Sequence, residues 1–243
     1  MIRWIVMSAT YQQSSASRPD LEEVDPGNRL LARQNRYRVE AEVLRDIALQ
    51  TAGLLSRKIG GPSVFPPLPA VIAQQTYAGS FKFEPSQGED RYRRGLYTFF
   101  RRTAIDPNLL TFDCPDSSMS RPARDRSNNP LQALATLQNE VFHEAAQALA
   151  GRLIRLSYAG GLEDQERLRH AFEIAVSRPP DAHEENIMLD LLTAARDYYG
   201  GKTKDAQQLV GNHAVADISL SQQAAWVTVS RAVLNLDEFL TRE

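Results

Sequence analysis

A run of arginines interleaved with aspartates, between residues 88 and 128, is the part of the sequence best suited to chemistry. Every basic residue in this run is an arginine. A planar guanidinium group can meet a carboxylate or a carbonyl through two hydrogen bonds, so this choice indicates fixed geometry rather than diffuse charge. The residues are Arg91, Arg93, Arg94, Arg101, Arg102, Arg121, Arg124 and Arg126, with Asp90, Asp106, Asp113, Asp116 and Asp125.

Two interpretations of this Arg/Asp-rich stretch follow. The first is an internal lattice of ion pairs that ties a long irregular segment to helices. The second is a site for an anionic ligand or substrate, in which Asp113 or Asp116 acts as general acid or base; this chemistry needs two carboxylates whose environments separate their pKa values. The ligand-binding candidates are Arg91, Arg93, Arg94, Arg124, Arg126 and Asn128.

A metal centre has one possible starting point. Glu140 and His143 have the Glu-x-x-His spacing of dinuclear iron helix bundles, but such a centre needs a second pair and two further glutamates, which we cannot assemble. Cys114 is the only cysteine, which excludes an internal disulfide and a Cys-x-x-Cys-His haem attachment. Its flanking aspartates disfavour the thiolate, so a packed thiol is expected. We therefore predict no metal, apart from the candidates Glu140 and His143, and no cofactor in this chain.

Composition narrows the class of protein. The chain has 243 residues, of which 42% are hydrophobic and 24% charged, as in an ordinary globular protein. A formal net charge of -2 disfavours binding to nucleic acid, because a surface that follows phosphates should be basic. No apolar run is long enough to span a bilayer. The apolar start is too short for the core of a signal peptide and is interrupted by Arg3.

The first half of the chain mixes helical and irregular patterns. Residues 1–12 are expected to form a short amphipathic helix or a buried strand, and apolar residues at steps of three and four predict one long helix, or two in line, over 28–55. The prolines that follow Gly60 end it, so residues 60–90 should be irregular and the place of any ligand pocket. Strand-forming residues at 96–100 predict a short strand or hairpin.

The second half is helical in pattern. Asn129 at the cap and Pro130 at the first helical position begin a helix, and Asp181 with Glu184 resembles a capping box. The expected fold class is mainly α: a helical bundle with a long irregular Pro/Gly/Arg-rich insertion and at most a short hairpin. We expect one domain over 1–243, with a helix plus the Arg/Asp-rich part in 1–128 and the bundle in 129–243. Helices are predicted over 130–157, 163–177, 182–199 and 221–239, with a polar loop over 200–218.

Several motifs, taken in order, resemble one family. The chain is similar to the C-terminal domain called DUF1553, or PSD1, of large exported proteins of planctomycetes and their relatives. It departs from the usual family pattern at Ser127-Asn-Asn-Pro and Leu137-Gln-Asn-Glu. The segments that carry the resemblance are Ile5-Val-Met-Ser-Ala-Thr-Tyr-Gln-Gln-Ser, Arg38-Val-Glu-Ala-Glu-Val-Leu-Arg-Asp, Gly60-Gly-Pro-Ser-Val, Asp90-Arg-Tyr-Arg-Arg-Gly-Leu-Tyr-Thr-Phe, Thr111-Phe-Asp-Cys-Pro-Asp, Asn129-Pro-Leu-Gln-Ala-Leu, Ser177-Arg-Pro-Pro and Leu234-Asn-Leu-Asp-Glu-Phe-Leu-Thr-Arg-Glu.

The resemblance implies a context rather than a reaction. In that family the domain commonly follows a cytochrome c-like module and a DUF1549 domain, which implies an exported or periplasmic location and those modules as partners. It also implies that the front of the domain and the signal peptide are absent from this chain. The expected function is a structural or interaction part of a haem-associated multidomain protein. The alternative is a hydrolase-like or binding domain for an acidic polysaccharide or another anionic ligand.

Overall fold

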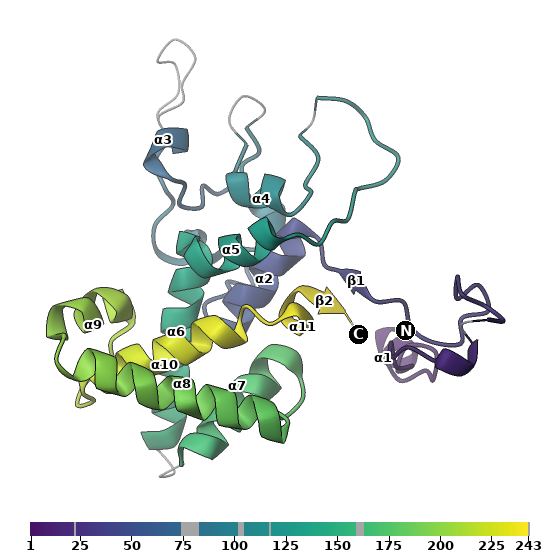
Figure 1. Cartoon of the computed structure of the whole chain (residues 1–243). Helices are drawn as coiled ribbons and strands as arrows, with labels where there is room; N and C mark the ends of the chain where they lie inside the picture. Colours follow the sequence, from purple (N-terminus) through teal and green to yellow (C-terminus); the bar gives the residue numbers. More distant parts are fainter. Residues whose placement is uncertain (22, 74–82, 102–104, 117, 159–162, 243) are drawn as a thin grey trace.

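The computed structural model describes residues 1–21, 23–73, 83–101, 105–116, 118–158 and 163–242. Within these residues the chain is mainly α-helical (Figure 1), which confirms the predicted fold class. Short 3-10 helices lie at η1 Pro19–Leu21, η2 Gly88–Tyr92, η3 Gly95–Tyr97 and η4 Gly211–His213. The α-helices are α1 Ile2–Val6, α2 Ala41–Ala52, α3 Ala70–Ala73, α4 Pro107–Thr111, α5 Pro130–Gln138, α6 Glu140–Tyr158, α7 Asp164–Val176, α8 Ala182–Gly200, α9 Thr203–Val210, α10 Leu220–Val233 and α11 Asp237–Leu240.

Helix α10 lies at the centre of the helical body. Its side chains Trp226, Val229 and Val233 are 0% exposed, as expected for a helix that other helices surround. Helix α10 packs against α8, α6 and α9, and α6 also packs against α2. The hydrophobic core therefore extends from the C-terminal helices to α2, against which much of the Arg/Asp-rich stretch is held.

The helix expected over residues 28–55 is shorter than its apolar spacing predicts. Only Ala41–Ala52 is helical, and the αL residue Gly53 (φ 76°) ends it. Upstream, Asn28 and Leu31 have positive φ angles of 49° and 55°, a conformation that no helix accommodates. The prediction was wrong for residues 28–40 and 53–55, because tight turns around Asn28 and the αL residue Gly53 interrupt a pattern that apolar periodicity alone reads as continuous.

The helix expected over 130–157 is divided in two. Asn139 adopts an extended conformation (φ -73°, ψ 142°), and its side-chain oxygen accepts a hydrogen bond of 2.9 Å from the N–H of Val141. Asparagine competes in this way with the helical backbone and starts a new helix, α6. Residues 200–218, expected to be a loop, contain helix α9, and the helix expected over 221–239 is divided into α10 and α11.

The sheet in the described chain joins two segments that are far apart in sequence. Strand β1 (Tyr37–Arg38) pairs in antiparallel fashion with β2 (Thr241–Arg242), with Tyr37 opposite Arg242. The strand or hairpin expected at 96–100 is absent from the described residues; this segment contains η3 and an isolated bridge between Val64 and Thr98. Strand propensity was misleading here, because these aromatic side chains pack in a loop instead of forming a ladder.

The predicted capping box at the start of α8 is confirmed. The side chain of Asp181 accepts hydrogen bonds from the backbone of His183 and Glu184, each of 2.8 Å, and the Glu184 carboxylate accepts one of 2.8 Å from the N–H of Asp181. We expect Asp181→Ala to lower the free energy of unfolding by about 1 kcal/mol, because it exposes helix N–H groups without a partner. Urea denaturation followed by circular dichroism measures this, and an unchanged unfolding midpoint would contradict it.

Candidate functional site

Asp113 and Arg38 form the innermost ion pair of the Arg/Asp-rich stretch. The Asp113 carboxylate accepts a short hydrogen bond from Arg38, and others from the N–H (2.7 Å) and the hydroxyl (3.0 Å) of Ser127. Arg38 is 5% exposed and also donates to the carbonyls of Ser127, Val39 and Phe112. Partial burial alone would raise the pKa of Asp113, but the Ser127 hydrogen bonds and the Arg38 charge lower it below its ordinary value. The pair connects β1 to the loop after α4.

A second cluster forms around Glu144 of α6. Its carboxylate accepts hydrogen bonds from Arg91 (2.9 and 3.1 Å) and from the hydroxyl of Tyr92 (2.8 Å), and His213 Nε2 lies 3.6 Å from Oε1. Burial alone would raise the pKa of Glu144, but His213, Arg91 and Tyr92 lower it to about 2. Arg91 also pairs with the exposed Glu140 at 3.0 Å. These contacts attach η2 to α6.

Arg93 is the most deeply buried of the described arginines of the stretch, at 1% exposure. Its guanidinium donates to the carbonyl oxygens of Pro62, at 3.0 Å, and of Gly60, and it stacks over the Tyr97 ring at 3.8 Å from the centroid. Irregular backbone lacks the regular hydrogen bonds of a helix or sheet. A buried guanidinium that donates to its carbonyl oxygens supplies such hydrogen bonds and stabilises its conformation. Arg93 therefore holds the segment that begins at Gly60.

Two further arginines pair with carboxylates of α2. Arg94 Nε donates to Asp46 at 3.1 Å, and the backbone N–H of Gly95 donates to the same carboxylate at 2.6 Å. Arg124 donates two hydrogen bonds, of 2.6 and 3.0 Å, to the Glu42 carboxylate. Gly95 allows this approach, because a Cβ there would lie 2.6 Å from the Glu42 carbonyl oxygen. Both ends of the segment between Arg94 and Arg124 are thus attached to α2.

Cys114 is buried beside Glu42, as the sequence led us to expect. Its Sγ lies 3.7 Å from Glu42 Oε1. Burial and the Glu42 carboxylate raise the pKa of the thiol to about 11. A thiol with this pKa is protonated at neutral pH, so it packs as a small apolar group and does not act as a nucleophile.

Arg126 and Asn128 differ from the other ligand-binding candidates, because they line an open cavity of about 320 Å³. The Arg126 guanidinium lies over the Tyr37 ring, 4.8 Å from its centroid. The Asn128 amide donates to Asp237 at 3.1 Å. The structure therefore places Arg91, Arg93, Arg94 and Arg124 in internal contacts and leaves these two at a hollow surface. Arg102 lies outside the described residues.

The two acid–base candidates do not lie in one cluster. Asp113 is fully engaged by Arg38 and Ser127, whereas Asp116 is exposed and accepts hydrogen bonds from the N–H (3.0 Å) and hydroxyl (2.7 Å) of Ser118. Hydrogen bonds from Ser118 lower the pKa of Asp116, so the pKa values of both carboxyls move in the same direction. Paired acid–base catalysis requires values that move apart. A catalytic role for either residue stays a prediction.

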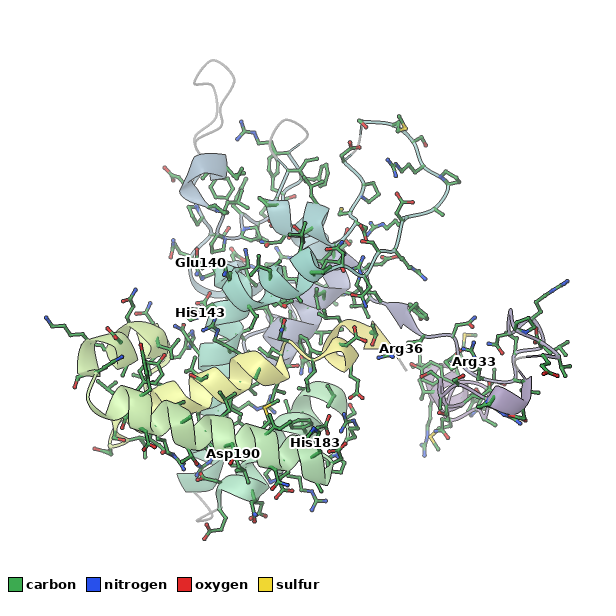
Figure 2. The ribbon with its side chains drawn as sticks, viewed as in Figure 1. Arg33, Arg36, Glu140, His143, His183 and Asp190 are labelled. Atoms are coloured by element: carbon green, nitrogen blue, oxygen red, sulfur yellow. The ribbon has the colours of Figure 1, made fainter. Side chains whose placement is uncertain are left out.

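The metal-ligand candidates Glu140 and His143 lie on the same helix, α6 (Figure 2), but contact different partners. Glu140 pairs with Arg91, while the His143 ring lies 3.1 Å from the Gln147 amide. Burial and the nearby Arg231 lower the pKa of His143. Among the residues that the structure describes, no three His, Cys, Asp or Glu side chains are grouped to hold a metal ion.

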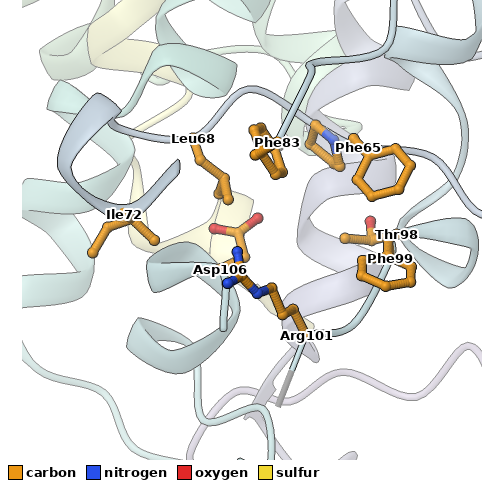
Figure 3. Close-up of a pocket in the computed structure, with 9 residues that line it drawn as sticks. Phe65, Leu68, Ile72, Phe83, Thr98, Phe99, Arg101 and Asp106 are labelled. Atoms are coloured by element: carbon orange, nitrogen blue, oxygen red, sulfur yellow. The ribbon is translucent and has the colours of Figure 1, made fainter. Parts of the chain in front are cut away.

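The segment expected to form a pocket does line one (Figure 3), although residues 74–82 of it lie outside the described part. Its cavity volume is about 10 Å³, which is space for about one water molecule. The rings of Phe65 and Phe83 meet edge to face, with centroids 5.8 Å apart. Asp106 also lines it, and burial raises the pKa of this carboxyl. This pocket is a packed aromatic cluster rather than a binding site for an organic molecule.

The residues that sequence reasoning missed belong to the Glu144 cluster. Tyr92, Glu144 and His213 come from η2, α6 and η4, so no local motif unites them. One signal was available: Glu144 follows Glu140 by one helical turn and faces the same side of α6. His213 gave no signal, because the fold of α9 and η4 brings it to α6.

Comparison with known proteins identifies a family but no activity. A model of the family described as PSD1, protein of unknown function (DUF1553), matches residues 1–192. No curated protein and no solved structure matches the chain. In the described part of the chain, no helix combines the length and apolar character needed to cross a membrane. The match spans the Arg/Asp-rich stretch, helices α5 to α7 and the first part of α8, and the chain belongs to the PSD1 (DUF1553) family.

Proposed function

We propose that this chain is a structural and interaction module of an exported, haem-associated multidomain protein of the planctomycete type. The observation that carries the proposal is the exposed apolar start of the chain. Helix α1 buries none of its residues, and the side chains of Met1, Ile2 and Trp4 are 96%, 79% and 82% exposed. Figure 1 shows this segment, in purple, beside the helical body.

An apolar segment of this kind favours a protein partner. Burying a tryptophan and an isoleucine of this exposure contributes about 1.5–3 kcal/mol for each side chain. The residues lie within the part of the chain that the family model matches, so the segment belongs to the family's domain. We propose a neighbouring cytochrome c-like or DUF1549 module as the partner, because the family resemblance implies those modules.

The Arg/Asp-rich stretch supports a structural role as well. Arg91, Arg93, Arg94 and Arg124 are each held by internal carboxylates or carbonyls, and these contacts fasten irregular chain to α2 and α6. The N–H donors used in these contacts are not available to a substrate. A rigid platform with an apolar docking segment is the function that this arrangement supports best.

The proposal is tested in the cells that produce the protein. The chain is isolated from them with a specific antibody and separated on a denaturing gel that is stained for covalent haem. We expect haem either in a band much heavier than 27.2 kDa or in a separate band that co-isolates with the chain. A band near 27.2 kDa with no co-isolated haem protein would overturn the proposal.

A variant pair links the result to the docking segment. A tagged chain carrying Ile2→Ser and Trp4→Ser is added to extract and compared with one carrying Ile187→Ser and Tyr198→Ser, whose native side chains are 50% and 53% exposed on α8. The first variant should recover at least tenfold less haem protein, and the second should match the wild type. Equal losses in both would show that exposed apolar area in general, not α1, drives the association.

We propose anion binding as the second candidate function. Arg126 favours it, because this arginine has no ion pair within the described part of the chain. The ligand class is that expected from the sequence, an acidic polysaccharide or another anion. Whether a reaction follows binding depends on Asp113 and Asp116, which stay candidates for acid and base.

A further inference from the structure

The cavity beside Arg126 is built where three distant segments meet. Strand β1 supplies Tyr37 and Arg38, the loop before α5 supplies Arg126 and Asn128, and the C-terminal segment supplies Asp237 and Thr241. Arg36, labelled in Figure 2, lies at the same junction. The volume of about 320 Å³ suits a small organic molecule.

Arg126 is the residue of this cavity whose charge and hydrogen-bond donors suit an anion. It is exposed, and among the described residues its guanidinium has no hydrogen-bond acceptor and no carboxylate partner. The cation–π contact with Tyr37, at 4.8 Å from the ring centroid, holds the guanidinium at the cavity without using its N–H donors. A planar guanidinium with free donors binds a carboxylate through two parallel hydrogen bonds.

The other charges of the cavity wall are already balanced. Arg38 pairs with Asp113, and both oxygens of Asp237 accept hydrogen bonds, from Arg36 at 2.7 Å and from Asn128 at 3.1 Å. Arg126 therefore adds one uncompensated positive charge. A smaller cavity of about 190 Å³, which Tyr37 and Arg126 also line, contains Glu40 in its wall. Glu40 shares its ion-pair partner Arg124 with Glu42, so a negative charge remains there and disfavours an anion.

We propose that this cavity binds the carboxylate of a small hydroxylated ligand, a sugar acid, with Arg126 as the principal binding residue. Among the residues that line the cavity, the hydroxyl groups of Tyr37 and Thr241 and the amide of Asn128 suit the hydroxyls of such a molecule. This inference deepens the second candidate function: it assigns anion recognition to one cavity and one arginine. It is independent of docking through α1.

The test is an NMR titration of the full chain with D-glucuronate, observing the Nε–H signal of Arg126. D-Glucose is the neutral counterpart, and sulfate tests for a general oxyanion site. We expect shifts of the Arg126 signal with glucuronate and none with glucose. Equal binding of glucose, or sulfate binding as tightly as glucuronate, would overturn the carboxylate assignment, while docking through α1 would be unaffected.

Three variants test the assignment of the site. Each is first checked for an unchanged thermal unfolding midpoint, and its affinity for glucuronate is then measured from the backbone NMR signals of Tyr37 and Thr241. Arg126→Gln should weaken glucuronate binding at least tenfold. Arg121→Gln, in the same loop but paired with Asp125 at 2.6 Å, should stay within twofold of the wild type. Asp237→Asn should tighten binding about threefold, because it removes a negative charge from the cavity wall. Wild-type affinity in Arg126→Gln would overturn the proposal.

Discussion

Asp113→Ala is expected to lower the free energy of unfolding by about 3–5 kcal/mol. The substitution leaves the Arg38 guanidinium, 5% exposed, with a buried charge and no counter-ion. It also removes the acceptor for the N–H and hydroxyl of Ser127. A further cost arises because Asp113 has a φ of 61°, a conformation that aspartate and asparagine tolerate better than alanine. Urea denaturation at pH 7 measures the change.

Two other variants separate the causes. Asp113→Asn keeps the side-chain shape and the backbone tolerance but loses the charge, so it should destabilise the protein less than Asp113→Ala does. Asp125→Ala breaks the exposed pair with Arg121 in the same loop and should cost less than about 1 kcal/mol. An effect of Asp113→Ala as small as that of Asp125→Ala would show that the Arg38 pair does not support the fold.

Glu144→Gln is expected to lower the free energy of unfolding at pH 7 by about 3 kcal/mol. The carboxyl has a pKa of about 2 in the folded chain against an ordinary value of 4.5. Because the folded value is lower, the charged form stabilises the fold fully above pH 4.5, and this stabilisation is lost as the pH falls toward 2. The difference of about 2.5 pH units corresponds to about 3 kcal/mol. Glutamine keeps the shape but cannot neutralise Arg91.

The pH dependence distinguishes charge from packing. Between pH 7 and pH 3.5, the stability difference between wild type and Glu144→Gln should shrink by about 1 kcal/mol, because the wild-type chain alone loses the benefit of its charged Glu144. Glu140→Gln is the matched control, since Glu140 pairs with the same Arg91 but its side chain is 59% exposed; it should cost less than about 1 kcal/mol. A stability difference that stays constant with pH would contradict the assigned role of Glu144.

Within the second half, α7 and α8 could be predicted closely from the sequence. Apolar spacing marks α7, α8 and α10, and the capping residues Asn129 and Asp181 mark the starts of α5 and α8. Two helix predictions were wrong where a single polar residue interrupts a helix that the apolar periodicity predicts as continuous. Asn139 divides one helix and Asn28 prevents another, because a side-chain hydrogen bond or a positive φ redirects the backbone within one residue.

The candidate site was predictable in composition but not in geometry. The sequence identified the arginines and aspartates, and one of its two interpretations, internal pairing, describes what Arg91, Arg94 and Arg124 do. The partners could not be foreseen, because Glu144, Asp46 and Glu42 lie 40 or more positions away from these arginines. Nothing in the local sequence separated Arg126 from its neighbours.

The sequence by itself determined the mainly α architecture, the family and the concentration of arginine in one stretch, because periodicity, motif order and composition are properties of the chain. Tertiary structure alone decided which arginines are paired internally and that Arg126 lines a cavity without an ion pair to a described residue. The pairing of β1 with β2 brings residues 36–38 beside Asp237 and Thr241, although Arg36 and Asp237 are 201 positions apart in the sequence. Charge compensation depends on distance in space, and only folding sets that distance.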